Sequence, residues 1–298
     1  MRYIAWTAAA ATMALFAVSA NAAQQQDFSK VEVKTTDLGH STYMLEGAGG
    51  NVTIAVGTNG VIMVDAQFAP MHDKLKAAIA KVTNQPVKYL INTHYHGDHT
   101  GGNAAFGKEG VTIVAQQNLK NRLVNPIPNA NGQTPAVAPP EALPAQLFAD
   151  KTTVSVGGRT AQVVHIAAHT DTDSVVYFPD ANVLAVGDTG GPNRYPNLDV
   201  GGGGTIDGMI AGVQTYLNMA NAQTKIVPGH GPLATKADFQ AYHDMLVQIR
   251  GRVAKLKAEG KSEDQAAAAK PLADIQATVN QDDMASERAV RLVYQTLK

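Results

Sequence analysis

A short segment rich in histidine offers the clearest chemistry in this sequence. It spans residues 91–103 and reads INTHYHGDHTGGN. The apolar run Val87–Ile91, typical of a buried strand, leads into it, so we expect the histidines in the loop that follows. Neutral imidazole and carboxylate groups are the ligands that zinc prefers in catalytic sites. We therefore predict a metal site here in preference to a solvated polar loop.

The spacing of these side chains favours a shared direction. In an extended loop, residues two positions apart point the same way, so His94, His96 and Asp98 can face one point. His99 then turns toward a neighbouring position, and Gly97 lets the backbone bend between them.

Three more candidate ligands each follow an apolar strand: His169, Asp188 and His230. A strand end on a rigid sheet holds a side chain more precisely than a free loop does. Each residue alone is a weak signal, because a single histidine after a strand is usually an ordinary polar loop residue. Together with the histidine segment, they predict one composite site.

The order of these residues resembles that of the metallo-β-lactamase-fold hydrolases. The resemblance covers residues 31–232 and rests on the motif His94-x-His96-x-Asp98-His99, then His169, Asp188 and His230. It implies an α/β (α+β) fold, a four-layer αββα sandwich, with a two-metal site along one edge. It also implies two ligand sets: His94, His96 and His169 for the first zinc, and Asp98, His99 and His230 for the second, with Asp188 bridging both. The C-terminal helices resemble those of a group of exported relatives.

The implied chemistry is metal-dependent hydrolysis. Two Zn²⁺ ions roughly 3.5–4 Å apart can share a hydroxide that attacks an acyl carbon or a phosphorus atom. Asp98 is the candidate catalytic residue, because it can orient the hydroxide and carry a proton. The ligands are all nitrogen and oxygen donors, a set that also suits iron or manganese.

Residues around the ligands also have candidate roles. Asp65 ends a strand, and metal-bound histidines usually donate their second N–H to a carboxylate, so we expect it to support a ligand. Arg194 and Tyr195, in the glycine-rich loop after Asp188, are the candidate substrate contacts.

The first 22 residues are expected to be a signal peptide. Arg2 precedes the apolar run 4–18, and Ala20-Asn21-Ala22 gives a cleavage pattern after Ala22. An uncleaved membrane anchor is the alternative. We expect a periplasmic or secreted protein without stable membrane association after cleavage.

Composition limits the partners. The chain has no cysteine and a net charge of −1, so disulfides are excluded and nothing indicates nucleic-acid binding. We expect a small-molecule substrate, and the sequence leaves the oligomeric state open.

Strand patterns come in two groups, each followed by helices. This order predicts one domain over residues 23–298, with a C-terminal helical extension from about residue 236. The proline-rich segment 125–144 shows no periodicity, and we interpret it as a long surface excursion.

Several reactions fit such a site. β-Lactam hydrolysis is the leading specific hypothesis, although β-lactamases of the family carry Cys or Ser where this chain has Asp188. Thioester hydrolysis, as in glyoxalase II, and phosphodiester hydrolysis are the alternatives. A mono-iron oxidoreductase similar to persulfide dioxygenases, and a zinc-binding protein without catalysis, are the alternatives of other classes.

Overall fold

The structure is a computed structural model that describes residues 27–129, 132–279 and 281–298. The predicted signal peptide lies outside these residues. Within the described ranges, no helix has both the length and the apolar character needed to cross a membrane.

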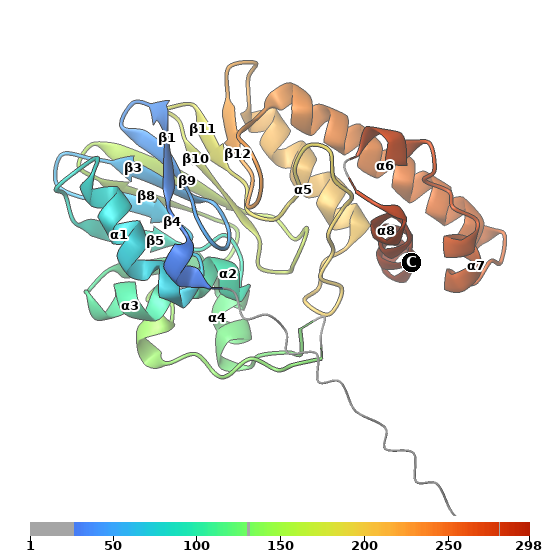
Figure 1. Ribbon diagram of the computed structural model, residues 1–298, viewed down its shortest axis with the longest axis horizontal. Coiled ribbons are helices and arrows are strands. Elements are labelled where there is room, and N and C mark those ends of the chain that lie inside the picture. The colour runs from blue at the N-terminus through green and yellow to red at the C-terminus, as the bar shows by residue number, and fades with distance from the viewer. Residues whose placement is uncertain (1–26, 130–131, 280) are drawn as a thin grey trace, which may run out of the picture.

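Two β-sheets form the centre of the molecule (Figure 1). The first has seven strands in the order β1 to β7, antiparallel from β1 to β4 and parallel from β4 to β7. The second has six strands in the order β13-β12-β11-β10-β9-β8. The strands of the first sheet are β1 (Lys34–Gly39), β2 (Thr42–Glu46), β3 (Val52–Val56), β4 (Val61–Val64), β5 (Val87–Ile91), β6 (Thr112–Gln116) and β7 (Gln146–Phe148). Those of the second are β8 (Lys151–Val156), β9 (Arg159–His165), β10 (Ser174–Phe178), β11 (Val183–Ala185), β12 (Lys225–Val227) and β13 (Ala234–Thr235).

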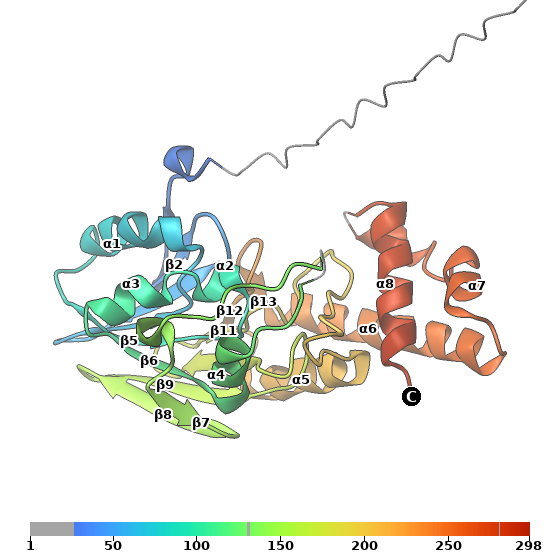
Figure 2. The same ribbon diagram turned by 90° about the horizontal axis from the view of Figure 1, so that it is seen from below.

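Helices cover both outer faces of the paired sheets (Figures 1 and 2). The first sheet carries α1 and α3, and the second carries α5 and α6. The helices are α1 (His72–Ala80), α2 (Gly97–Thr100), α3 (Asn103–Lys108), α4 (Gln117–Val124), α5 (Ile206–Met219), α6 (Lys236–Ala258), α7 (Glu263–Ala268) and α8 (Asp283–Thr296). The predicted αββα sandwich with extra C-terminal helices is confirmed.

Strand β4 shows why this layering suits the sequence. All four of its residues are buried, and successive side chains point to opposite faces of a sheet. Val61 and Met63 pack with the α1 side chains, whereas Ile62 and Val64 pack between the two sheets. An apolar run that is buried on both faces needs a layer on each side.

The C-terminal helices extend the second outer layer. Helix α6 packs along α5, and α8 packs against both α6 and α7. Their apolar residues join one core with the second sheet, through side chains such as Tyr216, Phe239, Leu246 and Val293. Helices α6 and α7 each begin with a capping box, at Thr235 and Ser262, which satisfies the free N–H groups of the first turn.

The strand that the sequence predicts at Val87–Ile91 is present as β5 with the same bounds. The first strand differs, because the pattern predicts Val31 to Thr35 and the structure has Lys34–Gly39. The excursion 125–144 is mostly irregular in its described part, with a short 3-10 turn at Pro140–Ala142. It is followed by β7, a three-residue strand whose pattern was too short to predict.

Candidate metal centre

The candidate ligands lie at one edge of the sandwich, because each follows the carboxyl end of a strand. Strands β4 and β5 run parallel in the first sheet. In the second sheet β11 is parallel to β12, and β9 has the same direction because both β9 and β11 are antiparallel to β10. The loops after these five strands therefore leave from one edge within each sheet, and these two edges lie together. They bring together side chains from His94 to His230, whose ligand atoms form two groups in which all members lie within 4.8 Å of one another.

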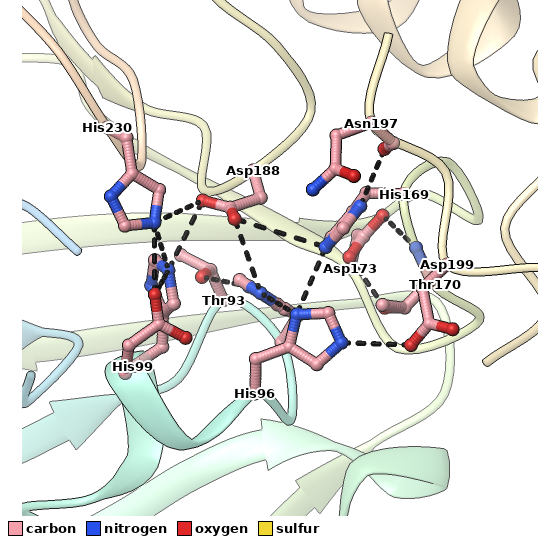
Figure 3. Close-up of polar contacts among 12 residues, drawn as sticks. Thr93, His96, His99, His169, Thr170, Asp173, Asp188, Asn197, Asp199 and His230 are labelled. Atoms are coloured by element: carbon pink, nitrogen blue, oxygen red, sulfur yellow. Dashed lines mark hydrogen bonds and ion pairs between the residues drawn. The ribbon is translucent and has the colours of Figure 1, made fainter. Parts of the chain in front are cut away.

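The first group consists of His94, His96, His169 and Asp188. Nδ1 of His96 lies 3.2 Å from Nε2 of His94 and 3.1 Å from Nε2 of His169. Oδ2 of Asp188 lies 3.9 Å from both of those Nε2 atoms. Figure 3 shows His96, His169 and Asp188 pointing toward a common centre.

The second group consists of Asp98, His99 and His230. Nε2 of His230 lies 3.1 Å from Oδ2 of Asp98 and 3.4 Å from Nε2 of His99. The other oxygen of Asp188, Oδ1, lies 3.2 Å from Nε2 of His99 and 3.5 Å from Nε2 of His230. The Asp188 carboxylate therefore faces both groups, one oxygen toward each.

The outer nitrogens of four histidines have partners that fix their ring orientation. The tautomers follow from these contacts, because each acceptor binds an N–H and leaves the opposite nitrogen as a lone pair. In this arrangement the inward atoms are Nδ1 of His96 and Nε2 of the other three rings. The outer contacts are His94 Nδ1 with Thr93 Oγ1 at 3.1 Å, His96 Nε2 with Asp199 Oδ2 at 2.9 Å, His99 Nδ1 with Asp65 Oδ2 at 2.8 Å, and His169 Nδ1 with Asn197 O at 2.7 Å.

These observations test whether the residues fit a metal. Lone pairs that face one another at about 3 Å repel unless a cation lies between them. Oδ1 of Asp188 is buried and has no hydrogen-bond partner among the described residues, as expected of an atom whose partner is an ion. Imidazole and carboxylate donors with inward lone pairs fit a divalent metal in each group.

The environment strongly shifts the pKa values of two of these ligands, His94 and Asp188. Burial lowers the pKa of His94 well below its usual value, so this ring is neutral and able to bind a metal. Burial alone would raise the pKa of Asp188, but the surrounding imidazoles of His99, His230 and His94 hold it well below its usual range. Asp188 is therefore an ionised carboxylate.

Asp65 lies where the sequence places it, behind the second group. Its side chain is buried. Besides the contact with His99, its Oδ1 accepts the backbone N–H of Thr93 at 2.8 Å and its Oδ2 accepts the Thr93 hydroxyl at 2.7 Å. Asp65 thus connects the end of β4 to the histidine loop.

Asp199 is a supporting residue that the sequence did not reveal. Its Oδ2 accepts hydrogen bonds from both His96 and the hydroxyl of Tyr95, and its Oδ1 accepts the backbone N–H of Gly202 at 2.9 Å. Burial alone would raise the pKa of Asp199, but the His96 and Tyr95 hydrogen bonds hold it well below its usual range. An aspartate in an otherwise glycine-rich loop was the available signal, but its partner His96 lies 103 residues away.

An ion pair between Arg122 and Asp171 lies beside Tyr95. Arg122 of α4 stacks over the Tyr95 ring at 5.9 Å and pairs with Asp171 at 2.7 Å. Asp171 belongs to the His169 loop, so this contact connects α4, the histidine loop and the His169 loop.

The two groups open onto a polar cavity of about 260 Å³. Arg194 and Asn197 line it and are exposed, and Arg194 is the one cationic Lys or Arg side chain among its lining residues. Tyr195 also lines the cavity, but its side chain is 4% exposed and its hydroxyl is enclosed without a hydrogen-bond partner among the described residues. Tyr195 stays a candidate substrate contact as a residue of the cavity lining, and its side chain also packs in the core formed with α5 and α6.

Comparisons with known proteins agree with this geometry. The family described as the Metallo-beta-lactamase superfamily matches residues 45–230. A linear primary-alkylsulfatase from Pseudomonas sp. (strain ATCC 19151) is 26% identical over 209 residues, which cover 58% of this chain and 39% of that protein. The chain thus spans about two fifths of the length of this curated relative.

Two solved structures share the fold. A metallo-beta-lactamase from Pontibacter korlensis aligns with a TM-score of 0.59 and 20% identity, over 72% of this chain and 99% of that one. The stereoselective inverting sec-alkylsulfatase from Pseudomonas sp. aligns with a TM-score of 0.63 and 16% identity, over 88% of this chain and 50% of that one. The alignment to the second structure is longer, so it takes in more of the chain than the lactamase alignment does.

Proposed function

The chain belongs to the metallo-β-lactamase superfamily, and on that premise we propose that it is a metal-dependent hydrolase of a small anionic substrate. The observation that carries this proposal is the Asp188 carboxylate, with one oxygen toward each group of histidines. Such an arrangement suits two metal ions with a shared carboxylate ligand. His94, His96 and His169 would hold the first ion and Asp98, His99 and His230 the second. Zinc is the metal that we propose, and the donor set also accepts iron or manganese.

Two bound metal ions supply Lewis acidity and lower the pKa of water in the site. The chain has no need of a serine or cysteine nucleophile for this chemistry, and it contains no cysteine. Asp98 lies at the cavity with its side chain 24% exposed, and its Oδ1 does not take part in the contact to His230. We assign this carboxylate to orienting the attacking water and accepting its proton.

Arg194 is the basis for proposing an anionic substrate. Its side chain is exposed at the cavity, and no ion pair among the described residues neutralises it. A guanidinium can bind a carboxylate or sulfate group in two parallel hydrogen bonds. We assign Arg194 to holding the charged end of the substrate, with the scissile bond directed at Asp98.

Within this class, β-lactam hydrolysis is the specific reaction that we propose first. A β-lactam carries both an acyl carbon and a carboxylate, and therefore suits Asp98 and Arg194 together. Export to the periplasm, where β-lactams act, is part of the same proposal and rests on the residue 1–22 pattern. The aspartate at position 188, where β-lactamases of the family carry Cys or Ser, leaves thioester and phosphodiester hydrolysis as the acyl and phosphoryl alternatives.

Hydrolysis of an alkyl sulfate is a second candidate that one observation favours. The sec-alkylsulfatase structure aligns with 88% of this chain, against 72% for the metallo-beta-lactamase. A sulfate ester also carries the negative charge that Arg194 would bind.

A substrate panel on metal-loaded protein tests these proposals. It would contain nitrocefin, S-lactoylglutathione, bis-p-nitrophenyl phosphate and decyl sulfate, and Asp98→Asn would serve as the inactive control. We expect turnover of one substrate class by the parent protein and its loss in the variant. Oxygen uptake by protein that holds one iron per chain would instead indicate the oxidoreductase alternative. No turnover of any substrate would reject the hydrolase proposal.

A further inference from the structure

Residues Gly49–Asn51, in the turn between β2 and β3, contact Asp98, His99 and the loop that carries His230. The backbone N–H of Gly50 donates to the carbonyl of Asp98 at 2.9 Å. A side chain at Gly50 would lie 2.1 Å from Cε1 of His99, so its Cα lies directly against that ring. Asn51 reaches the third member, because its side chain and backbone bind the loop that carries His230.

Asn51 holds that loop on both sides of His230. Its Nδ2 donates to the carbonyls of Pro228 and Gly231, both at 2.9 Å, and its backbone N–H donates to the carbonyl of Gly229 at 2.7 Å. The two residues that flank His230 are glycines, and Gly231 has a φ of +99°. Glycine backbones are conformationally free, so this segment cannot fix His230 without outside contacts.

A close contact with the Asp188 loop explains why position 229 is a glycine. A Cβ at Gly229 would lie 2.0 Å from Oδ1 of Asp188, and the Gly229 N–H donates to the carbonyl of Gly187 at 2.7 Å. This close approach lets the His230 loop pack on the Asp188 loop. The flexibility that glycine brings is then offset by Asn51 from the opposite side.

The first ligand group has different supports. Within the described part of the chain, the hydrogen bonds of residues 49–51 reach Gln67, Asp98 and residues 228–231, and none reaches His94, His96 or His169. His96 and His169 rely instead on Asp199 and the carbonyl of Asn197. Residues 49–51 therefore support the second group and make no hydrogen bond to the histidines of the first.

We propose that Asn51 is a positioning residue that builds the second metal position independently of the first. This inference rests on the ligand assignment given under Proposed function. Residues that orient a ligand from outside typically change metal affinity by roughly 10–100-fold when they are replaced. Replacing Asn51 should therefore weaken the second ion by about that factor and leave the first unchanged.

The test is a metal titration of Asn51→Ala in the full chain. Metal-free protein would be titrated with Co²⁺ in competition with a chromophoric chelator, and the visible absorption would report on each site. We expect two binding constants in the parent protein, with the one for the second group reduced roughly 10–100-fold in the variant. Asn51→Ser can donate one hydrogen bond in place of two. Its affinity for the second ion should therefore lie between those of the parent protein and Asn51→Ala. Asn218→Ala, the same change on the exposed face of α5, is the matched control and should bind as the parent does.

Two results would overturn the inference. One is unchanged binding of both ions in Asn51→Ala. The other is an equal loss of both ions, in a variant whose far-ultraviolet circular dichroism matches that of the parent. Should Asn51→Ala not fold, Asn51→Ser decides by the same criteria. The titration uses no substrate, so a failed substrate panel would reject the proposed reaction without affecting this result.

Discussion

The contact between Asp65 and His99 allows a prediction worked out from single atoms. Oδ2 of Asp65 accepts the Nδ1–H of His99 at 2.8 Å, and this leaves Nε2 of His99 as the lone pair that faces Asp188. In Asp65→Asn an NH₂ group must replace one of the two carboxylate oxygens. Whichever way the amide is turned, that group meets a donor, either on Thr93 or on His99.

In the favoured orientation of the amide, His99 loses the lone pair that would bind the metal. With NH₂ in the place of Oδ2, His99 satisfies it by accepting at Nδ1, and the ring proton moves to Nε2. Hydrogen bonds to charged groups contribute about 1.5–3 kcal/mol, and about 1.4 kcal/mol corresponds to a tenfold change in affinity. We therefore expect the second ion to bind roughly 10–100-fold more weakly. The metal-free protein should lose about 3 kcal/mol of unfolding free energy, because a buried carboxylate with three donors is lost.

Isothermal titration with Zn²⁺ and urea denaturation of metal-free protein measure these two effects. Asp37→Asn is the control, because Asp37 is an exposed carboxylate that accepts one backbone N–H, from Gly39. Full metal affinity in Asp65→Asn, with stability within 0.5 kcal/mol of the control on the scale of ordinary surface substitutions, would refute the role that we give to this contact.

Four other predictions follow from the site. Asp98→Asn should lower kcat by roughly 10²–10⁴ on the substrate that the panel identifies, and a full rate would exclude this carboxylate as the base. Arg194→Ala should raise KM for an anionic substrate with little change in kcat, whereas equal kinetics would place the anion elsewhere. Gly190→Ala should destabilise the protein by about 1–3 kcal/mol in urea unfolding, because its Cβ would lie 2.1 Å from Cε1 of Tyr242. An unchanged midpoint of urea unfolding would show that the Tyr242 ring moves aside without cost. Chelation should lower Tm, since bound ions stabilise by about 2.7 kcal/mol at a hundredfold excess over Kd, and a constant Tm would indicate that no ion is held.

The candidate ligands could be predicted from the sequence because each has a local signal. The histidine segment has a rare composition, and Asp188 and His230 directly follow apolar strands. Strand ends on one edge of a sandwich lie close together. The separate candidate ligands therefore predicted one shared metal site. The resemblance supplied the pairing of ligands, which spacing alone left open.

The supporting residues could not be predicted in the same way. Asp199 and Asn51 act over 103 and 177 residues of sequence, and nothing in their neighbourhoods indicates which loop they meet. Asn51 lies in a glycine-rich turn that the sequence marks only as a hairpin connection. The burial of Tyr195 could not be predicted either, because it depends on packing with α5 and α6, which follow later in the chain. Such contacts are decided by how the loops pack against one another.

The most direct test of the account is the number and position of metal ions in the purified protein. Anomalous diffraction from crystals grown with Zn²⁺ locates each ion relative to the side chains. We predict two ions per chain, one among His94, His96 and His169 and the other among Asp98, His99 and His230, with one oxygen of Asp188 toward each. A single ion that leaves Asp188 on one side only, or ions bound away from these residues, would contradict the account.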